Sequence, residues 1–233
     1  MAILVTAVSA CVANAQIRMD TTTGLPGFDS ALMAGDQFHG NIVNGMTPVG
    51  GWTITVTGVN NPIGLFGSTT TSEQGAVSPR VNPGANFMQL DMSFDKTWNG
   101  VTLFYDGNPP NSTNFFTPDD KQTFTLSGGA VWDVISSTNL NIVGAGTNTI
   151  TLTTTGNPTY EIAPSAPISG LTFRFDNLDG QPNGTTTVLD FSDATVAPES
   201  GSVWLILPGL ILVSAVAVRR YQREKREQPA PQL

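Results

Sequence analysis

The feature that most constrains this chain is a two-residue alternation of apolar side chains with threonine, repeated in short segments. Residues 51–58 read GWTITVTG, which places Trp52, Ile54 and Val56 on one face of an extended strand and three threonines on the other. Comparable runs occupy residues 101–105, 122–126, 130–135, 148–154, 171–175 and 187–191. Threonine and β-branched residues favour strands, so we expect an all-β body.

Turn-forming residues separate these runs. Asp-Gly-Asn-Pro at 106–109, Ser-Gly-Gly at 127–129, Gly-Asn-Pro at 156–158 and Asp-Gly at 179–180 are typical of turns. Short strands at this spacing are typical of antiparallel two-sheet folds. We therefore predict an antiparallel β-sandwich resembling a jelly roll.

Charge is distributed unevenly along the 233 residues. Sixteen acidic and five basic residues precede Gly201, which gives this part of the chain a formal charge of −11. Five basic residues against two glutamates follow Val218, which gives +3. The body lacks the basic surface needed to neutralise phosphates, so nucleic acid is not an expected partner.

The N-terminal residues 1–15 are predicted to be a signal peptide. The run Ala2–Ala13 is apolar but too short to span a bilayer, and Ala13-Asn14-Ala15 fits the small-residue cleavage pattern. Val8-Ser9-Ala10-Cys11 also resembles a lipobox, so lipidation of Cys11 stays open. Cys11 is the only cysteine, which leaves the mature body without a disulfide or a thiolate zinc site.

A charge-free segment near the C-terminus predicts one transmembrane helix at about residues 203–218. As a helix rising about 1.5 Å per residue it would extend about 24 Å, close to the thickness of a hydrocarbon layer. Trp204 lies where an interfacial aromatic residue is expected. Arg219 and Arg220 begin a basic stop over residues 219–226, which by the positive-inside rule keeps residues 227–233 in the cytoplasm and the body outside.

The sequence Pro198-Glu199-Ser200, followed by an apolar helix and Arg219-Arg220, resembles the PEP-CTERM sorting domain. Ser200 stands where that family has a second proline. The resemblance covers residues 197–226 and implies processing by an exosortase, a membrane-embedded protease, before delivery to the cell surface or extracellular matrix. It further implies a structural or adhesive role in the envelope or exopolysaccharide, with Leu189–Asp193 comparable to the closing strand of such ectodomains.

Catalytic chemistry has few candidates in the sequence. His39 is the only histidine and has no cysteine or second histidine nearby, which argues against a zinc site or a Ser-His triad. Acid pairs that glycoside hydrolysis would need are limited to Asp91 with Asp95, Asp119 with Asp120, and Asp176 with Asp179. We do not expect an enzyme, and a secreted hydrolase is the least favoured alternative.

One loop has some character of a calcium site. Asp176 and Asp179 supply carboxylates beside Gly180, and calcium prefers several oxygen ligands. A simple Asx turn is the competing interpretation. No cofactor is otherwise expected.

Carbohydrate binding is the main alternative function. Aromatic rings stack against sugar rings, and the candidates are Trp52, Trp98, Trp132, Phe104 and Tyr105. A tryptophan in a strand more often belongs to the core.

Taken together, the sequence predicts four segments: a signal peptide (1–15), a β-sandwich ectodomain (16–196), a sorting and anchoring segment (197–226) and a tail (227–233). The expected partners are a membrane, an exosortase-type protease and a polysaccharide.

Overall fold

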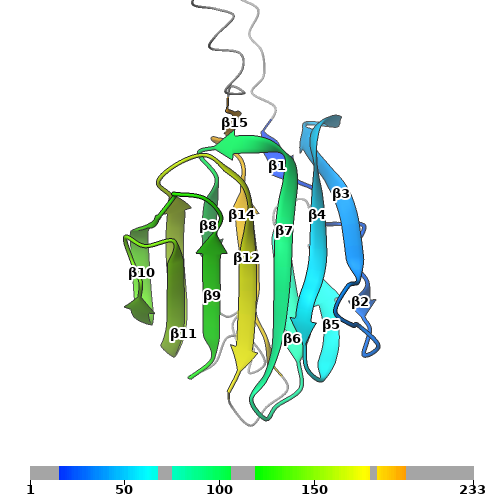
Figure 1. Ribbon diagram of the computed structural model, residues 1–233, viewed down its shortest axis with the longest axis vertical. Helices are drawn as coiled ribbons and strands as arrows, with labels where there is room; N and C mark the ends of the chain where they lie inside the picture. The colour runs from blue at the N-terminus through cyan, green and yellow to red at the C-terminus, as the bar shows by residue number, and fades with distance from the viewer. Residues whose placement is uncertain (1–15, 68–74, 106–118, 179–182, 198–233) are drawn as a thin grey trace, which may run out of the picture. The chain divides into compact units, whose positions relative to one another are not determined.

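The computed structural model describes residues 16–67, 75–105, 119–178 and 183–197, and these residues form an all-β fold (Figure 1). The strands run antiparallel to their neighbours throughout. Their bounds are β1 (Ile17–Met19), β2 (Gly27–Phe28), β3 (Gln37–Asn44), β4 (Thr47–Val59), β5 (Pro62–Phe66), β6 (Ala76–Val81), β7 (Asn86–Asn99), β8 (Thr102–Tyr105), β9 (Lys121–Leu126), β10 (Trp132–Val143), β11 (Thr149–Pro164), β12 (Ile168–Asn177), β13 (Asn183–Gly184), β14 (Thr187–Asp190) and β15 (Thr195–Val196).

Hydrogen bonding joins the strands into one strongly curled open sheet. Its order is β1-β3-β4-β7-β12-β9-β11-β8-β14-β6-β5-β2, with β10 on β11, β13 on β6 and β15 on β7. Figure 1 shows β11, β9, β12, β7 and β4 side by side in front, with β8, β14, β6 and β5 behind them. An antiparallel all-β fold is therefore confirmed.

The curl occurs within β11. The first part of this strand, Thr149–Thr153, pairs with β9, whereas Tyr160–Ile162 pairs with β8. Residues 156–158, which we predicted to form a turn between strands, instead lie within β11, in a bulge where residues 155–158 have no register partner on β10. The Asn139 side chain donates a hydrogen bond to the Asn157 carbonyl at 2.8 Å, which ties β10 to this bend.

Each predicted strand lies within or overlaps an observed one, and the observed strands are often longer. β7 was not predicted although it pairs with both β4 and β12 in the middle of the front layer. No helix in the described part of the chain is long and apolar enough to cross a membrane. The predicted signal peptide and the predicted helix at 203–218 lie outside the described residues.

Aromatic side chains fill the interior between the front and back strands. Phe124 stacks on Phe173 with ring centroids 4.8 Å apart, and Trp132 approaches Phe124 edge-on at 6.0 Å. A second group forms where Trp98 and Phe94 each meet Phe191 edge-on. Burying each such ring contributes about 1.5–3 kcal/mol. Phe124 and Phe173 join adjacent front strands, whereas Phe191 follows β14 of the back strands and joins that layer to β7.

Trp52 lies over a glycine on the neighbouring strand. Gly40 of β3 is its register partner, and a Cβ added to Gly40 would fall 2.2 Å from the indole ring. The Trp52 Nε1 donates a hydrogen bond to the Asp20 carbonyl at 3.0 Å, which fixes the ring in place. Only glycine at position 40 leaves room for this arrangement.

We expect Gly40→Ala to lower the free energy of unfolding by about 1–3 kcal/mol, because the methyl group must displace the Trp52 ring. Urea denaturation followed by tryptophan fluorescence measures this change. Gly129→Ala is the control, since nothing lies within 4 Å of a Cβ at that position. Equal midpoints for the two variants would contradict the packing described for Trp52.

Candidate functional site

A hollow with a volume of about 410 Å³ opens where four strands meet at the bend of the sheet. β8, β10, β11 and β14 contribute its lining. The lining residues are Thr102, Phe104, Tyr105, Ser136, Thr159, Tyr160, Glu161 and Asp190. Partly open cavities with an aromatic residue and a few convergent polar groups are typical of ligand sites.

Phe104 is the aromatic residue on the outer face of this hollow. Its neighbours along β8, Leu103 and Tyr105, are buried in the core, so alternation turns Phe104 the other way. Its register partners are Glu161 on β11 and Val188 on β14, and all three are half-buried. The ring of Phe104 is therefore flanked by a carboxylate on one side and an apolar side chain on the other.

Carboxylates and hydroxyls surround this ring. Glu161 forms no hydrogen bond or ion pair within the described residues, so its oxygens are available to a ligand. Asp190 accepts hydrogen bonds from the backbone N–H and hydroxyl of Ser192 at 2.7 and 3.0 Å, which fixes its carboxylate. Thr102 lies opposite Asp190 in the register and adds a hydroxyl.

A buried polar network supports the hollow from the core side. The Tyr160 hydroxyl donates to the Gln122 side-chain oxygen at 2.5 Å and lies 3.0 Å from the Thr187 hydroxyl. Gln122 in turn donates to the hydroxyl of Thr185. These bonds join β9, β11 and β14, and a buried network with satisfied partners makes this wall of the hollow rigid.

Two tyrosines stack beside this network. The rings of Tyr105 and Tyr160 are 6.1 Å apart and nearly parallel. Burial raises the pKa of both phenols above the ordinary value of about 10. Both therefore remain neutral wherever the protein is folded at physiological pH.

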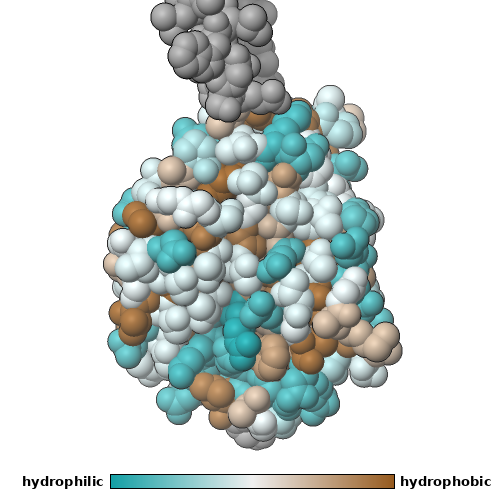
Figure 2. Space-filling model, viewed as in Figure 1, coloured by the Kyte–Doolittle hydropathy of each residue, from teal (hydrophilic) through white to brown (hydrophobic). Residues whose placement is uncertain are grey.

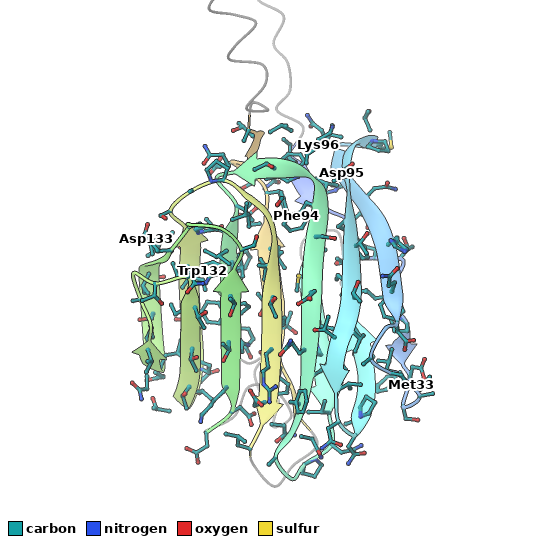
Figure 3. All side chains as sticks on the ribbon, viewed as in Figure 1. Met33, Phe94, Asp95, Lys96, Trp132 and Asp133 are labelled. Atoms are coloured by element: carbon teal, nitrogen blue, oxygen red, sulfur yellow. The ribbon has the colours of Figure 1, made fainter. Side chains whose placement is uncertain are left out.

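The three tryptophans predicted to bind a ligand lie in the core. Trp52, Trp98 and Trp132 are each no more than 2% exposed. The Trp132 Nε1 donates to the Phe124 carbonyl at 3.1 Å, and Figure 3 labels Trp132 close to Asp133, where β10 begins. In this structure none of the three presents a ring to solvent, so the aromatic candidate that remains accessible is Phe104.

The calcium candidate is divided between described and undescribed residues. Asp176 forms a two-pronged ion pair with Arg174, whose Nε and Nη2 lie 2.6 to 3.0 Å from its carboxylate. Asp179 lies outside the described residues. Within the described ranges no group of three or more His, Cys, Asp or Glu side chains is placed to hold a metal ion.

Other predicted residues have ordinary structural roles or cannot be placed. Asp91 accepts a hydrogen bond from Thr172 at 2.8 Å, and His39 lies 3.0 Å from the Thr53 hydroxyl, both on the outer face of the front strands. The sorting residues Pro198, Glu199 and Ser200 and the stop residues Arg219 and Arg220 lie outside the described part of the chain.

Glu161 is the residue that sequence reasoning missed. It lies between Tyr160 and Ile162, whose inward position leaves Glu161 on the outer face. Its proximity to Phe104 depends on the pairing of β11 with β8, which no local pattern reveals. The alternation in residues 159–163 was the only available signal.

Comparison of the chain with protein-family models, with curated proteins and with solved structures found no match.

The buried tyrosines predict a specific pH dependence of stability. Unfolding lowers their pKa values to about 10, so the unfolded state loses protons first and stability falls as pH rises above about 10. The slope should reach about 1.4 kcal/mol per pH unit for each tyrosine. Tyr160→Phe should be less stable at neutral pH yet show a shallower loss above pH 10. Parallel pH profiles of denaturation midpoints for the two proteins would contradict this.

Proposed function

We propose that this protein is an exported surface or matrix protein whose β body binds a neutral polysaccharide and does not transform it. The observation that carries the proposal is the hollow in which Phe104 lies beside Glu161, with Asp190 and several hydroxyls around it. A sugar ring has an apolar face and a polar edge, and this arrangement offers a complementary surface to both.

The ligand is inferred to be uncharged. Residues 16–196 carry a formal charge of −10, and Glu161 and Asp190 both line the hollow. Two carboxylates would repel the carboxylates or sulfates of an acidic polysaccharide. Hydroxyl groups of a neutral sugar instead donate hydrogen bonds to those same oxygens.

Export and anchoring are proposed from the sequence pattern. Residues 1–15 resemble a signal peptide, and residues 197–226 resemble a PEP-CTERM sorting segment with a membrane helix and a basic stop. A polysaccharide-binding body suits delivery to a cell surface or to an exopolysaccharide matrix. Processing by an exosortase-type protease is part of this proposal.

We further propose that the curled sheet has the architecture of a β-sandwich resembling a jelly roll. The support is that β11 belongs to the front strands at one end and to the back strands at the other, with aromatic residues packed between. A rigid two-layered body of this kind would present the hollow on a fixed surface.

The main alternative is a structural or adhesive protein that binds no sugar at this hollow. A secreted hydrolase is a third possibility, and Glu161 would be its acid. Turnover of a polysaccharide that Glu161→Gln abolishes would favour the hydrolase. Binding without release of reducing ends agrees with the proposal.

Phe104→Ala is expected to weaken polysaccharide binding roughly two- to tenfold, because one aromatic contact contributes about 0.5–1.5 kcal/mol. The measurement is affinity electrophoresis of the full chain through gels containing neutral glucans, mannans or xylans, with alginate as an anionic comparison. Phe28→Ala is the matched control, since Phe28 is 76% exposed on β2, remote in the strand order from the hollow. Equal losses for both variants, or no retention on any neutral polymer, would contradict the proposal.

Removing residues 197–233 should convert a membrane-bound product into a released one, because the proposed anchor lies entirely in that segment. Fractionation of cells that export the full and the shortened chains measures this. A full-length chain found only in the cytosol would overturn the proposed export.

A further inference from the structure

The edge of the sheet at β10 is open in the described part of the chain. β10 pairs with β11 on one side and has no second neighbour among the described strands. It forms the outermost strand of its side of the sheet in Figure 1, and Figure 3 places Asp133 at that margin. Unpaired N–H and C=O groups along such an edge can accept another strand.

The edge at β3 is protected in a way that β10 is not. Residues 20–25 run along β3, where the Asp20 N–H donates to the Asn41 carbonyl at 2.9 Å. A Cβ at Gly24 would fall 2.5 Å from the His39 carbonyl, which shows how closely that cover lies. The chain thus covers one edge with its own backbone.

The composition of β10 favours pairing with another strand. Asp133 is its only charged residue, and the strand contains neither lysine nor proline, the residues that commonly protect edges. Ile135 and Val143 are 55% and 63% exposed. Figure 2 shows hydrophobic residues at the side of the molecule where β10 lies.

The hydrophobic core is also incompletely covered there. Val134, Leu140 and Ile142 pack against the core but remain partly exposed. A strand added beside β10 would cover these side chains as well as satisfy the backbone. The unpaired backbone groups of β10 and its partly exposed apolar side chains therefore both favour the addition of another strand.

We propose that a second copy of this chain adds its own β10 to this edge, antiparallel and about a two-fold axis. The strongly acidic body makes most contacts between copies repulsive, whereas β10 carries a single charge at one end. In a dimer with a two-fold axis the same segment of each copy forms the interface, so the uncharged part of β10 in one copy pairs with the uncharged part of β10 in the other.

The bulges of β10 define which residues pair. Register shifts relative to β11 fall at Ile135 and Asn139, and Asn139 has a positive φ of 54°. The longest regular run without a bulge or a charge is Leu140–Val143, which pairs continuously with Thr151–Thr154. We place the new pairing on this run.

The direction of the side chains then limits the register to those that place core-facing residues opposite core-facing residues. Leu140 and Ile142 face the core side, whereas Asn141 and Val143 face outward. Directly opposed residues share a face, and the register that we propose sets Leu140 opposite the second copy's Ile142 and Asn141 opposite its own equivalent on the two-fold axis. The two Asn141 amides can donate to and accept from each other. Three residues of each copy, Leu140, Asn141 and Ile142, are then directly opposed, and so small an interface belongs to the weak class.

Cysteine crosslinking tests this register. The full chain carrying Cys11→Ser has no other thiol, so Asn141→Cys introduces a single one. Opposed residues in paired strands lie about 4.5–5.5 Å apart, within the range of a disulfide. We expect Asn141→Cys to form a disulfide-linked dimer under mild oxidation on non-reducing gels.

Thr153→Cys is the matched control. Thr153 is the register partner of Asn141 on β11, on the same face but one strand farther from the axis. Its two copies would be separated by three strand spacings, about 14 Å, which a disulfide cannot bridge. Equal crosslinking of the two variants, or none for Asn141→Cys, would overturn the proposal.

A charge placed on the axis provides a second test. Asn141→Lys sets two ammonium groups opposite each other, so the dimer seen by sedimentation velocity at high concentration should be lost, with partial recovery at high salt. Thr153→Lys should leave the dimer intact. A chain that sediments as a monomer at every concentration, or a dimer that survives Asn141→Lys, would reject this mode of pairing.

Discussion

The continuity of β11 is the constraint on which the rest of the structure depends. This strand bonds to β9 near its start and to β8 near its end, with a bulge at residues 155–158 between the two pairings, so the sheet must curl within the length of that strand. The curl turns the apolar faces of front and back strands toward each other, where Phe124, Phe173 and Trp132 pack. The same pairing sets Glu161 beside Phe104, so the hollow is a direct consequence of the bend.

Register along this bend is specified by polar contacts as well as by apolar burial. A slip of one residue would move Tyr160 out of the core and Glu161 into it, which would bury an unpaired carboxylate. It would also separate the Tyr160 hydroxyl from Gln122 and Thr187. The buried network therefore penalises alternative pairings and keeps the surface beside it in one arrangement.

The sequence predicted the local structure better than the arrangement of strands. Alternation around Trp52 located β4, because a two-residue period is a property of one strand alone. The Gly-Asn-Pro group at 156–158 lies in the part of β11 that has no register partner on β8, β9 or β10, so its turn-like composition produces a bulge inside a long strand and does not end the strand. The meeting of Phe104 with Glu161 could not be predicted, because it requires knowing that strands 50 or more residues apart pair.

The tryptophans show why residue type alone does not identify a binding surface. Glycines at 40 and 50 create the space that Trp52 and Trp98 fill, so these rings serve the packing between neighbouring strands. Phe104 instead has an acidic register partner, Glu161, and an apolar one, Val188. Its two neighbours along β8 are large side chains that point into the core. Exposure of an aromatic ring thus follows from its place in the alternation and from what its cross-strand partners leave uncovered.

The same reasoning applies to β10, where a row of apolar side chains stays partly exposed because no described strand lies beside it on that side. Since Ser136 of that strand also lines the hollow, the proposed pairing of two chains would bring two such hollows onto one assembly, and a long polymer that bound in the proposed way could engage both with a gain in effective concentration.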